Sequence, residues 1–269
     1  MTVIAGQELH HLTQATRRLG AVFARPKSIA ATCVVVLAGL GWLTLGLQFA
    51  GVGFVEALCR PTASGGGAAN FAAVAAMWSA MTLAMMLPSA APMILTYAEI
   101  ADTAAGKNET VVSPFALAAG YTAVWLGFSV VAALAQLGLM RASLIDSHMI
   151  AASGLFSSAI FIAAGAYQFS SLKQACLTQC QHPFSFFFTK WKTTPRGVFG
   201  LGLRQGLYCL GCCWAMMLVM FAVGVMNVIW MAALGIIMAI EKIGAGKWFT
   251  QSVGVALIVI GVAFALMSV

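Results

Sequence analysis

Long apolar runs, separated by short polar connections, are the feature that most limits what this chain can fold into. Of its 269 residues, 61% are hydrophobic and 8% are charged, whereas a soluble domain carries about 25% charged residues. A helix needs about 20 apolar residues to cross a bilayer, because lipid offers the backbone no hydrogen-bond partners. The sequence therefore predicts an all-α fold, a polytopic bundle of transmembrane helices surrounded by the lipid bilayer.

The apolar runs predict about seven spans. They form a single transmembrane domain, residues 29–269, after a cytoplasmic N-terminal tail, residues 1–28. The stretch Gly206–Ile240 is too long for one span, and we divide it at Gly224 and Asn227. The predicted spans lie near residues 29–50, 70–93, 114–139, 150–170, 206–224, 226–240 and 248–269.

Positive charges test the number of spans, because short cytoplasmic loops collect lysine and arginine. With seven spans and a cytoplasmic N-terminus, 12 of the 14 basic residues lie inside, and only Arg60 and Arg141 lie outside. Treating residues 206–240 as one helix changes the ratio of inside to outside basic residues from 12:2 to 10:4. Seven spans therefore fit better than six. The basic residues occupy connections and form no basic stripe, so nucleic acid is not expected as a partner.

The densest group of soft metal-binding side chains is the segment Tyr-Cys-Leu-Gly-Cys-Cys-Trp-Ala-Met-Met, residues 208–217. On a helix, Cys209 and Cys213 lie on one face, and Cys212 is adjacent to it. Buried free cysteines also pack as small hydrophobic residues. Three thiols within five residues nevertheless favour a metal site built on thiolates.

A second pair of thiols, Cys176 and Cys180, is spaced one helical turn apart. Their spacing alone does not define a zinc site. In the seven-span topology this pair, the cysteines of residues 208–217, and Met85 and Met86 all fall toward the cytoplasmic side of the bilayer. Three separate segments are therefore predicted to place soft ligands at a similar depth.

Methionines follow a helical spacing in the second predicted span. Met77, Met81 and Met85 occupy positions i, i+4 and i+8, which share one helical face. Methionine is also an ordinary filler of apolar cores. With Met217 and Met220, the outer methionines Met77 and Met81 are a candidate relay for Cu(I) toward the outer face.

Several polar and aromatic residues within or beside the spans are expected to have structural roles. Asn227 is expected to hydrogen-bond to another helix. Glu241 and Lys242 are interpreted as a solvated helix end, and the aromatic run Phe184–Phe188 is expected in the membrane interface.

Several of these motifs occur together in one bacterial family. They are Met77-Trp78, Ala84-Met85-Met86-Leu87-Pro88, Tyr167-Gln168, Lys173, Cys176-Leu177, residues 208–217, Gly224, Met226-Asn227, Trp230-Met231 and Glu241-Lys242. Over about Asn70 to Lys242 the chain resembles the bacterial family described as predicted metal-binding integral membrane proteins, a domain of unknown function. The resemblance implies a metal-binding protein of the bacterial inner membrane, and it supplies no established substrate or ligand set.

The leading hypothesis is a membrane protein that binds a soft transition metal, most readily Cu(I), because thiolates and thioethers favour Cu(I) over harder ions. It would handle copper or deliver it to a copper enzyme, with a copper-binding protein or a membrane enzyme as its partner. Another transition metal stays open. The expected ligands are Cys209, Cys212, Cys213, Cys176, Cys180, Met85 and Met86.

Two other functions remain open from the sequence. One is a membrane thiol–disulfide oxidoreductase, in which Cys176 and Cys180 exchange disulfides with the cysteines of residues 208–217. The other is a structural or assembly subunit of a membrane complex, whose cysteines only pack. No common catalytic motif is present, so the sequence does not decide whether the protein is an enzyme.

Overall fold

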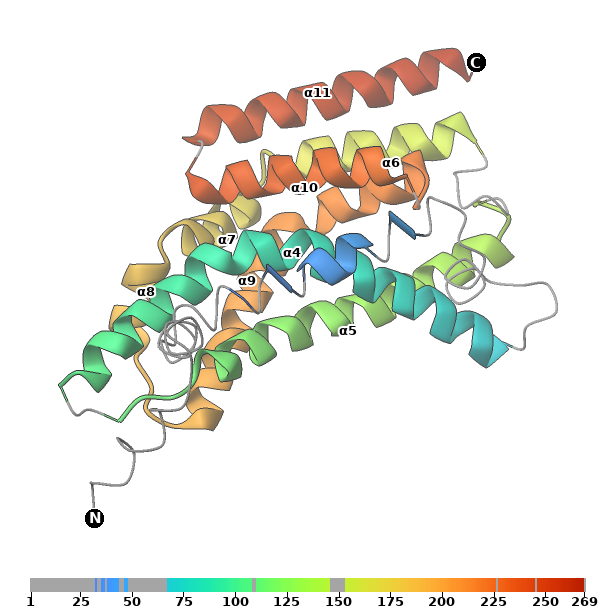
Figure 1. The fold of residues 1–269 in the computed structure, drawn as a ribbon. Coiled ribbons are helices and arrows are strands. Elements are labelled where there is room, and N and C mark those ends of the chain that lie inside the picture. Colours follow the sequence, from blue (N-terminus) through green and yellow to red (C-terminus); the bar gives the residue numbers. More distant parts are fainter. Residues whose placement is uncertain are drawn as a thin grey trace.

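The fold is helical throughout the part of the chain that the computed structural model describes (Figure 1). The described residues are 67–107, 110–145, 153–225, 227–244 and 246–268, with 32, 35–36, 38–43 and 46–47 nearer the N-terminus. None of them forms a β-strand, and the prediction of an all-α fold is confirmed. The predicted tail, residues 1–28, and much of the first predicted span, residues 29–50, lie outside the described residues.

The helices follow one another with short connections. In chain order they are α4 (Gly67–Ala105), α5 (Pro114–Arg141), α6 (Gly154–Tyr167), α7 (Ser171–Gln181), α8 (Pro183–Lys190), α9 (Pro195–Val223), α10 (Val228–Ile243) and α11 (Gly246–Met267).

Four of the described helices, α4, α5, α9 and α11, are long and apolar enough to cross a membrane. Helices α6 and α7 would make a fifth span if this pair, bent by 63°, crosses as one unit. Helix α10 has 16 residues and is about 24 Å long, which is shorter than the hydrocarbon core of about 30 Å. The total of seven spans and the cytoplasmic N-terminus stay predictions.

Two prolines lie within α4 without ending it. Because proline has no backbone N–H, Pro88 leaves the carbonyl of Ala84 without its usual partner in the helix. The indole N–H of Trp42 donates to this carbonyl at 2.9 Å. In the following turn, the Ser89 hydroxyl donates to the Met86 carbonyl at 2.8 Å. A side chain from outside the helix thus compensates for the hydrogen bond that Pro88 removes.

Helix α9 begins earlier than the predicted span, which starts at residue 206. It starts at Pro195, and the Thr194 hydroxyl accepts a hydrogen bond from the backbone N–H of Gly197 at 3.2 Å. Proline is favourable in the first turn, where its missing donor is not needed. The prediction followed the apolar run and therefore missed the polar first turns of this helix.

The break between α9 and α10 coincides with the residues at which we divided the apolar stretch. Gly224 follows α9 with φ 97°, a left-handed value that glycine adopts without a steric penalty. Asn227 then caps α10, and its side chain accepts a hydrogen bond from the N–H of Trp230 at 3.2 Å. The hydrogen bond of this asparagine is thus made within its own helix, whereas we expected it to reach another helix.

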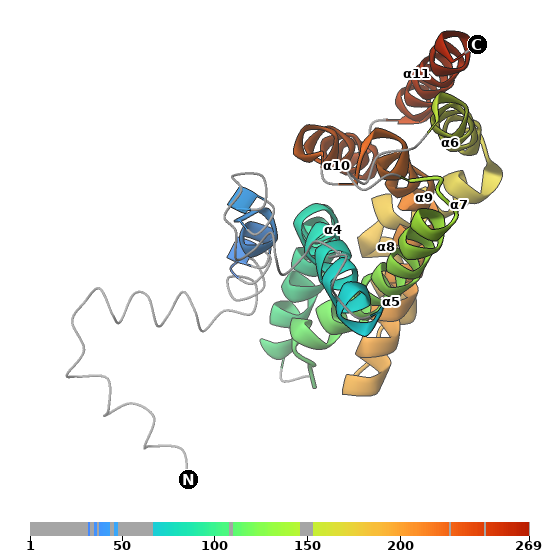
Figure 2. The same ribbon diagram turned by 90° about the vertical axis from the view of Figure 1, so that its right-hand side faces the viewer.

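Glycines allow pairs of helices to approach closely. A Cβ added at Gly120 of α5 would clash with the Phe199 carbonyl, and one at Gly202 of α9 would clash with the Leu117 carbonyl. A similar contact joins α6 and α11, where a Cβ at Gly165 would lie 2.7 Å from the Gly254 carbonyl oxygen. These two helices lie side by side in both views of the bundle (Figures 1 and 2). Small residues at such contacts are typical of membrane helices.

The close packing of α5 against α9 predicts a position-specific effect of alanine. Gly202→Ala should destabilise the protein by about 1–3 kcal/mol, because overpacking forces the helices apart. Gly200→Ala is the matched control on the same helix, since an added Cβ there meets nothing within 4 Å. Thermal unfolding in detergent would measure both variants, and equal midpoints for the two would contradict the proposed packing.

Candidate metal centre

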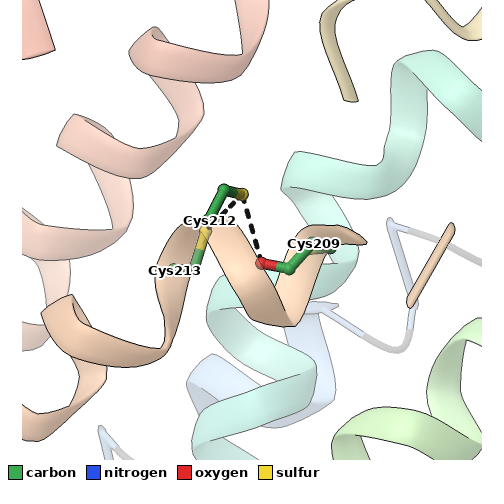
Figure 3. Close-up of side chains that lie close together, drawn as sticks. All are labelled: Cys209, Cys212 and Cys213. Carbon is green, nitrogen blue, oxygen red and sulfur yellow. Dashed lines mark hydrogen bonds between the residues drawn. The ribbon is translucent and has the colours of Figure 1, made fainter. Parts of the chain in front are cut away.

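Three cysteines of α9 form a compact group of sulfur atoms. Cys209, Cys212 and Cys213 have exposed fractions of 2%, 1% and 1%, and their Sγ atoms all lie within 4.8 Å of one another. The Sγ atoms of Cys212 and Cys213 are 3.3 Å apart, and the Cys212 thiol donates to the Cys209 carbonyl at 3.1 Å (Figure 3). The helical spacing i, i+3, i+4 brings them together. Among the described residues they are the group that could hold a metal ion.

The spacing of these sulfur atoms fits a single metal ion. Metal–thiolate bonds of about 2.3 Å, as at zinc sites, place three sulfur ligands roughly 4 Å apart around one ion. The separations are 3.3 Å between the Sγ atoms of Cys212 and Cys213 and no more than 4.8 Å for any pair, which is close to this value. All three cysteines are free thiols. Small side-chain rotations would therefore bring the three sulfur atoms onto one ion.

A small cavity lies beside Cys209. Its volume is about 20 Å³, and about 10–15 Å³ is enough for one water molecule. Its lining comes from five helices: Ser89, Ala90, Pro92 and Met93 of α4, Tyr121 of α5, Cys180 of α7, Gln205 and Cys209 of α9, and Lys242 of α10. The site therefore has room for one ligand of the size of water or an ion.

Lys242 is part of this site, and the interpretation of Glu241 and Lys242 as a solvated helix end is wrong. The two residues are only 2% and 8% exposed. The Lys242 ammonium donates to Cys209 Sγ at 3.0 Å and to Ser89 Oγ at 2.6 Å, and it lies 4.0 Å from Met86 Sδ. It thus connects α10 with both α9 and α4.

The periodicity of α10 is the sequence signal that indicates this burial. Met231, Leu234 and Met238 are the buried apolar residues of this helix. Continuing their spacing by three and four residues from Met238 leads to Glu241 and Lys242. Both charged residues therefore lie on the face that α10 presents to the core, although they are in its last turn.

Glu241 forms a buried ion pair with Lys173 of α7. The ammonium lies 2.8 Å from Glu241 Oε2, and the two side chains are 0% and 1% exposed. Gln181, at the end of α7, donates to the Glu241 carbonyl at 2.7 Å. The side chains of Lys173 and Gln181 thus hold α7 against the last turn of α10.

The burial of two lysines also changes the charge count that supports seven spans. Lys173 and Lys242 are buried inside the protein, so neither acts as a loop charge. Without them the split for seven spans becomes 10:2, and that for six spans becomes 9:3. The charge count still favours seven spans over six, but by a smaller margin.

Tyr121 of α5 is a further site residue that the sequence did not single out. Its hydroxyl oxygen lies 2.9 Å from Cys209 Sγ, and its hydroxyl is 3.2 Å from the Met86 carbonyl, which can accept its hydrogen. The side chain is 2% exposed. An isolated tyrosine in an apolar span gives no periodic signal, so only the packing of α5 against α9 reveals its position.

The other expected ligands divide into two groups. Cys180 lines the cavity and its side chain interacts with that of Cys212, and Met86 contacts Lys242. Cys176 instead lies half-buried against Gly211, and Met85 lies over Gly235 of α10. The structure therefore brings Cys180 and Met86 to the cysteine group, whereas Cys176 and Met85 contact helix backbone.

The four methionines of the expected relay are buried in the core. Met77, Met81, Met217 and Met220 have exposed fractions between 0% and 1%, and they belong to one cluster of buried residues with the three cysteines of α9. The four methionines therefore lie in the same buried core as the thiol group.

Comparison with known proteins identifies the family. A family model described as PpoB2, copper chaperone, matches residues 75–264, which is more than two thirds of the chain. The chain belongs to this copper chaperone family. The matched region includes the cysteines of α7 and α9 and also Lys242. No curated protein and no solved structure matches the chain.

Membership of the copper chaperone family agrees with the metal-binding character that the sequence predicts. It indicates copper handling, and the cysteine group of α9 could bind the metal. The family assignment shows a copper-related family and does not test the resemblance to the domain of unknown function.

The buried ion pair between α7 and α10 predicts a large effect on stability. Replacing Lys173 by Met leaves the Glu241 carboxylate buried and unpaired, which should cost about 3–5 kcal/mol in the free energy of unfolding. Lys192→Met is the matched control, because Lys192 is exposed and should change stability by less than about 0.5 kcal/mol. Chemical denaturation in detergent would compare them, and equal stabilities would show that the pair contributes nothing.

Proposed function

We propose that this protein binds Cu(I) within the membrane through the thiolates of Cys209, Cys212 and Cys213, and delivers it to a copper-binding protein or a membrane enzyme. The observation that carries the proposal is the group of three buried sulfur atoms within 4.8 Å beside a cavity of about 20 Å³. Thiolates are soft ligands and suit Cu(I). The copper chaperone family supports copper as the cargo.

Cys180 and Met86 are proposed as additional ligands, because each contacts a member of the site. Cys180 interacts with Cys212, and a single ammonium contacts both Met86 Sδ and Cys209 Sγ. Cys176 packs against Gly211 and Met85 lies over Gly235 of α10, so neither is proposed as a ligand.

The surroundings of the site fit transfer across part of a bilayer. In the proposed orientation the cysteines face the cytoplasmic side of the bacterial inner membrane, and Met77, Met81, Met217 and Met220 extend the sulfur-rich core toward the outer side. Thioethers bind Cu(I) without needing to lose a proton. A copper ion could therefore pass between the thiol group and the methionines without crossing a carboxylate site.

Thiol–disulfide exchange is supported less well. An attacking thiolate must reach a sulfur atom in order to exchange, and the three sulfur atoms of α9 belong to residues that are 2% exposed or less. The two cysteines of α7 are more accessible, but they face α9, with Cys176 beside Gly211 and Cys180 beside Cys212. Binding of a metal cargo to the thiols of α9 does not require access to the disulfide of a second protein.

Metal analysis tests the thiol group directly. Protein purified in detergent under anaerobic conditions and loaded with Cu(I) should hold about one copper per chain, since one group of three thiols is present. Replacing Cys209, Cys212 and Cys213 together by Ser should abolish this binding. Cys176→Ser is the matched control and should keep the copper. Unchanged copper content in the triple variant would contradict the proposed site.

The position of Met86 beside Lys242 predicts a smaller effect. Met86→Leu should weaken Cu(I) affinity by a factor of about 10, equivalent to about 1.4 kcal/mol, because one thioether ligand is removed while the apolar volume is nearly kept. Met85→Leu should leave the affinity unchanged, since Met85 lies over Gly235. Competition with a chromogenic Cu(I) chelator would measure both, and a larger loss in Met85→Leu would reverse the assignment.

A further inference from the structure

The ammonium group of Lys242 shares the cavity of the proposed copper site. It lines the same cavity as Cys209 and Cys180, and its Nζ lies 3.0 Å from Cys209 Sγ. A metal bound to this sulfur at about 2.3 Å would therefore lie within roughly 5 Å of the ammonium. A positive side chain and a positive cargo thus occupy the same small space.

A second hydrogen bond would hold the ammonium beside the cavity when a metal binds Cys209. Ser89 Oγ accepts its hydrogen bond at 2.6 Å, and this contact does not involve a metal ligand. The neighbouring carboxylate, Glu241, points to Lys173. No carboxylate lines the cavity among the described residues, so no negative oxygen there offsets the charge of Lys242.

The repulsion between Lys242 and a bound metal scales with the charge of the metal. A divalent ion experiences twice the repulsion of a monovalent ion at the same position. Salt screens buried charges only weakly, and the Lys242 side chain is 8% exposed. Among ions that thiolates accept, Zn²⁺ is thus penalised more than Cu(I).

We propose that Lys242 determines the selectivity of this site by disfavouring divalent cations relative to Cu(I). The proposal rests on the proposed function, because it assumes that the cysteines of α9 bind the metal. Lys242 also provides a counter-charge for a thiolate at Cys209, which assists every thiolate-bound metal alike. That contribution cancels in the ratio of the Zn²⁺ and Cu(I) dissociation constants, so the ratio isolates the effect of the charge on the cargo.

Four variants would separate charge from structure. Lys242→Gln and Lys242→Leu remove the charge, and Lys242→Arg keeps it. Lys247→Gln removes the charge of an exposed lysine at the start of α11 and is the matched control. Full-length protein in detergent would be titrated anaerobically with Cu(I) and, separately, with Zn²⁺, each against a chromogenic chelator, and size-exclusion chromatography would confirm that each variant remains folded.

The expected result is a loss of selectivity when the charge is removed. The ratio of the Zn²⁺ to the Cu(I) dissociation constant should fall at least tenfold in whichever of Lys242→Gln and Lys242→Leu is folded, and should stay within threefold of the unchanged protein in Lys242→Arg and Lys247→Gln. A ratio that stays within threefold of the unchanged protein in the neutral variants would overturn the proposal. Failure of both neutral variants to fold while Lys242→Arg folds would also overturn it, because Lys242 would then have a structural role. Absence of cysteine-dependent Cu(I) binding in the unchanged protein would instead overturn the proposed function.

Discussion

The burial of two lysine ammonium groups is the constraint on which the packing at this site depends. A charge removed from water is costly unless it is paired and hydrogen-bonded. Lys173 meets this requirement through Glu241, and Lys242 does so through Ser89 and Cys209. Because Glu241 and Lys242 are consecutive, the last turn of α10 must face α7 on one side and α4 and α9 on the other. The position of α10 is thereby fixed.

The same constraint places the second source of thiols. Helix α7 is short, with 11 residues, and follows α6 with a bend of 63°. The pair of Lys173 with Glu241 and the hydrogen bond from Gln181 attach it to α10. Cys180 lies between these two residues in sequence, and it is carried to the cavity beside Cys209. The ion pair between Lys173 and Glu241 therefore helps to place Cys180 beside the three cysteines of α9.

Local features of the fold could be predicted from the sequence, and non-local ones could not. Apolar run length predicts the helices, and glycine with asparagine predicts the break before α10, because both act within one turn of the chain. The spacing of Cys209 to Cys213 similarly brings three sulfur atoms together within one helix. Whether Cys180 or Cys176 joins them depends on the rotation of α7 about its axis, which is set by contacts with other helices. The role of Lys242 was missed because a charge in a last helical turn is usually solvated, and the apolar periodicity of α10 outweighs that rule here.

The membrane environment and a soft metal require the same kinds of side chain. A site for a hard cation needs several oxygen ligands, often carboxylates, and such groups are costly at hydrocarbon depth. Thioethers and thiols are polarizable ligands for Cu(I), yet they pack as apolar groups. The 15 methionines and 7 cysteines of this chain, against only 7 acidic residues, therefore supply soft ligands without a penalty for burying them. In such a core, the ammonium of Lys242, which has no carboxylate partner among the described residues, has a large influence on which cation can bind.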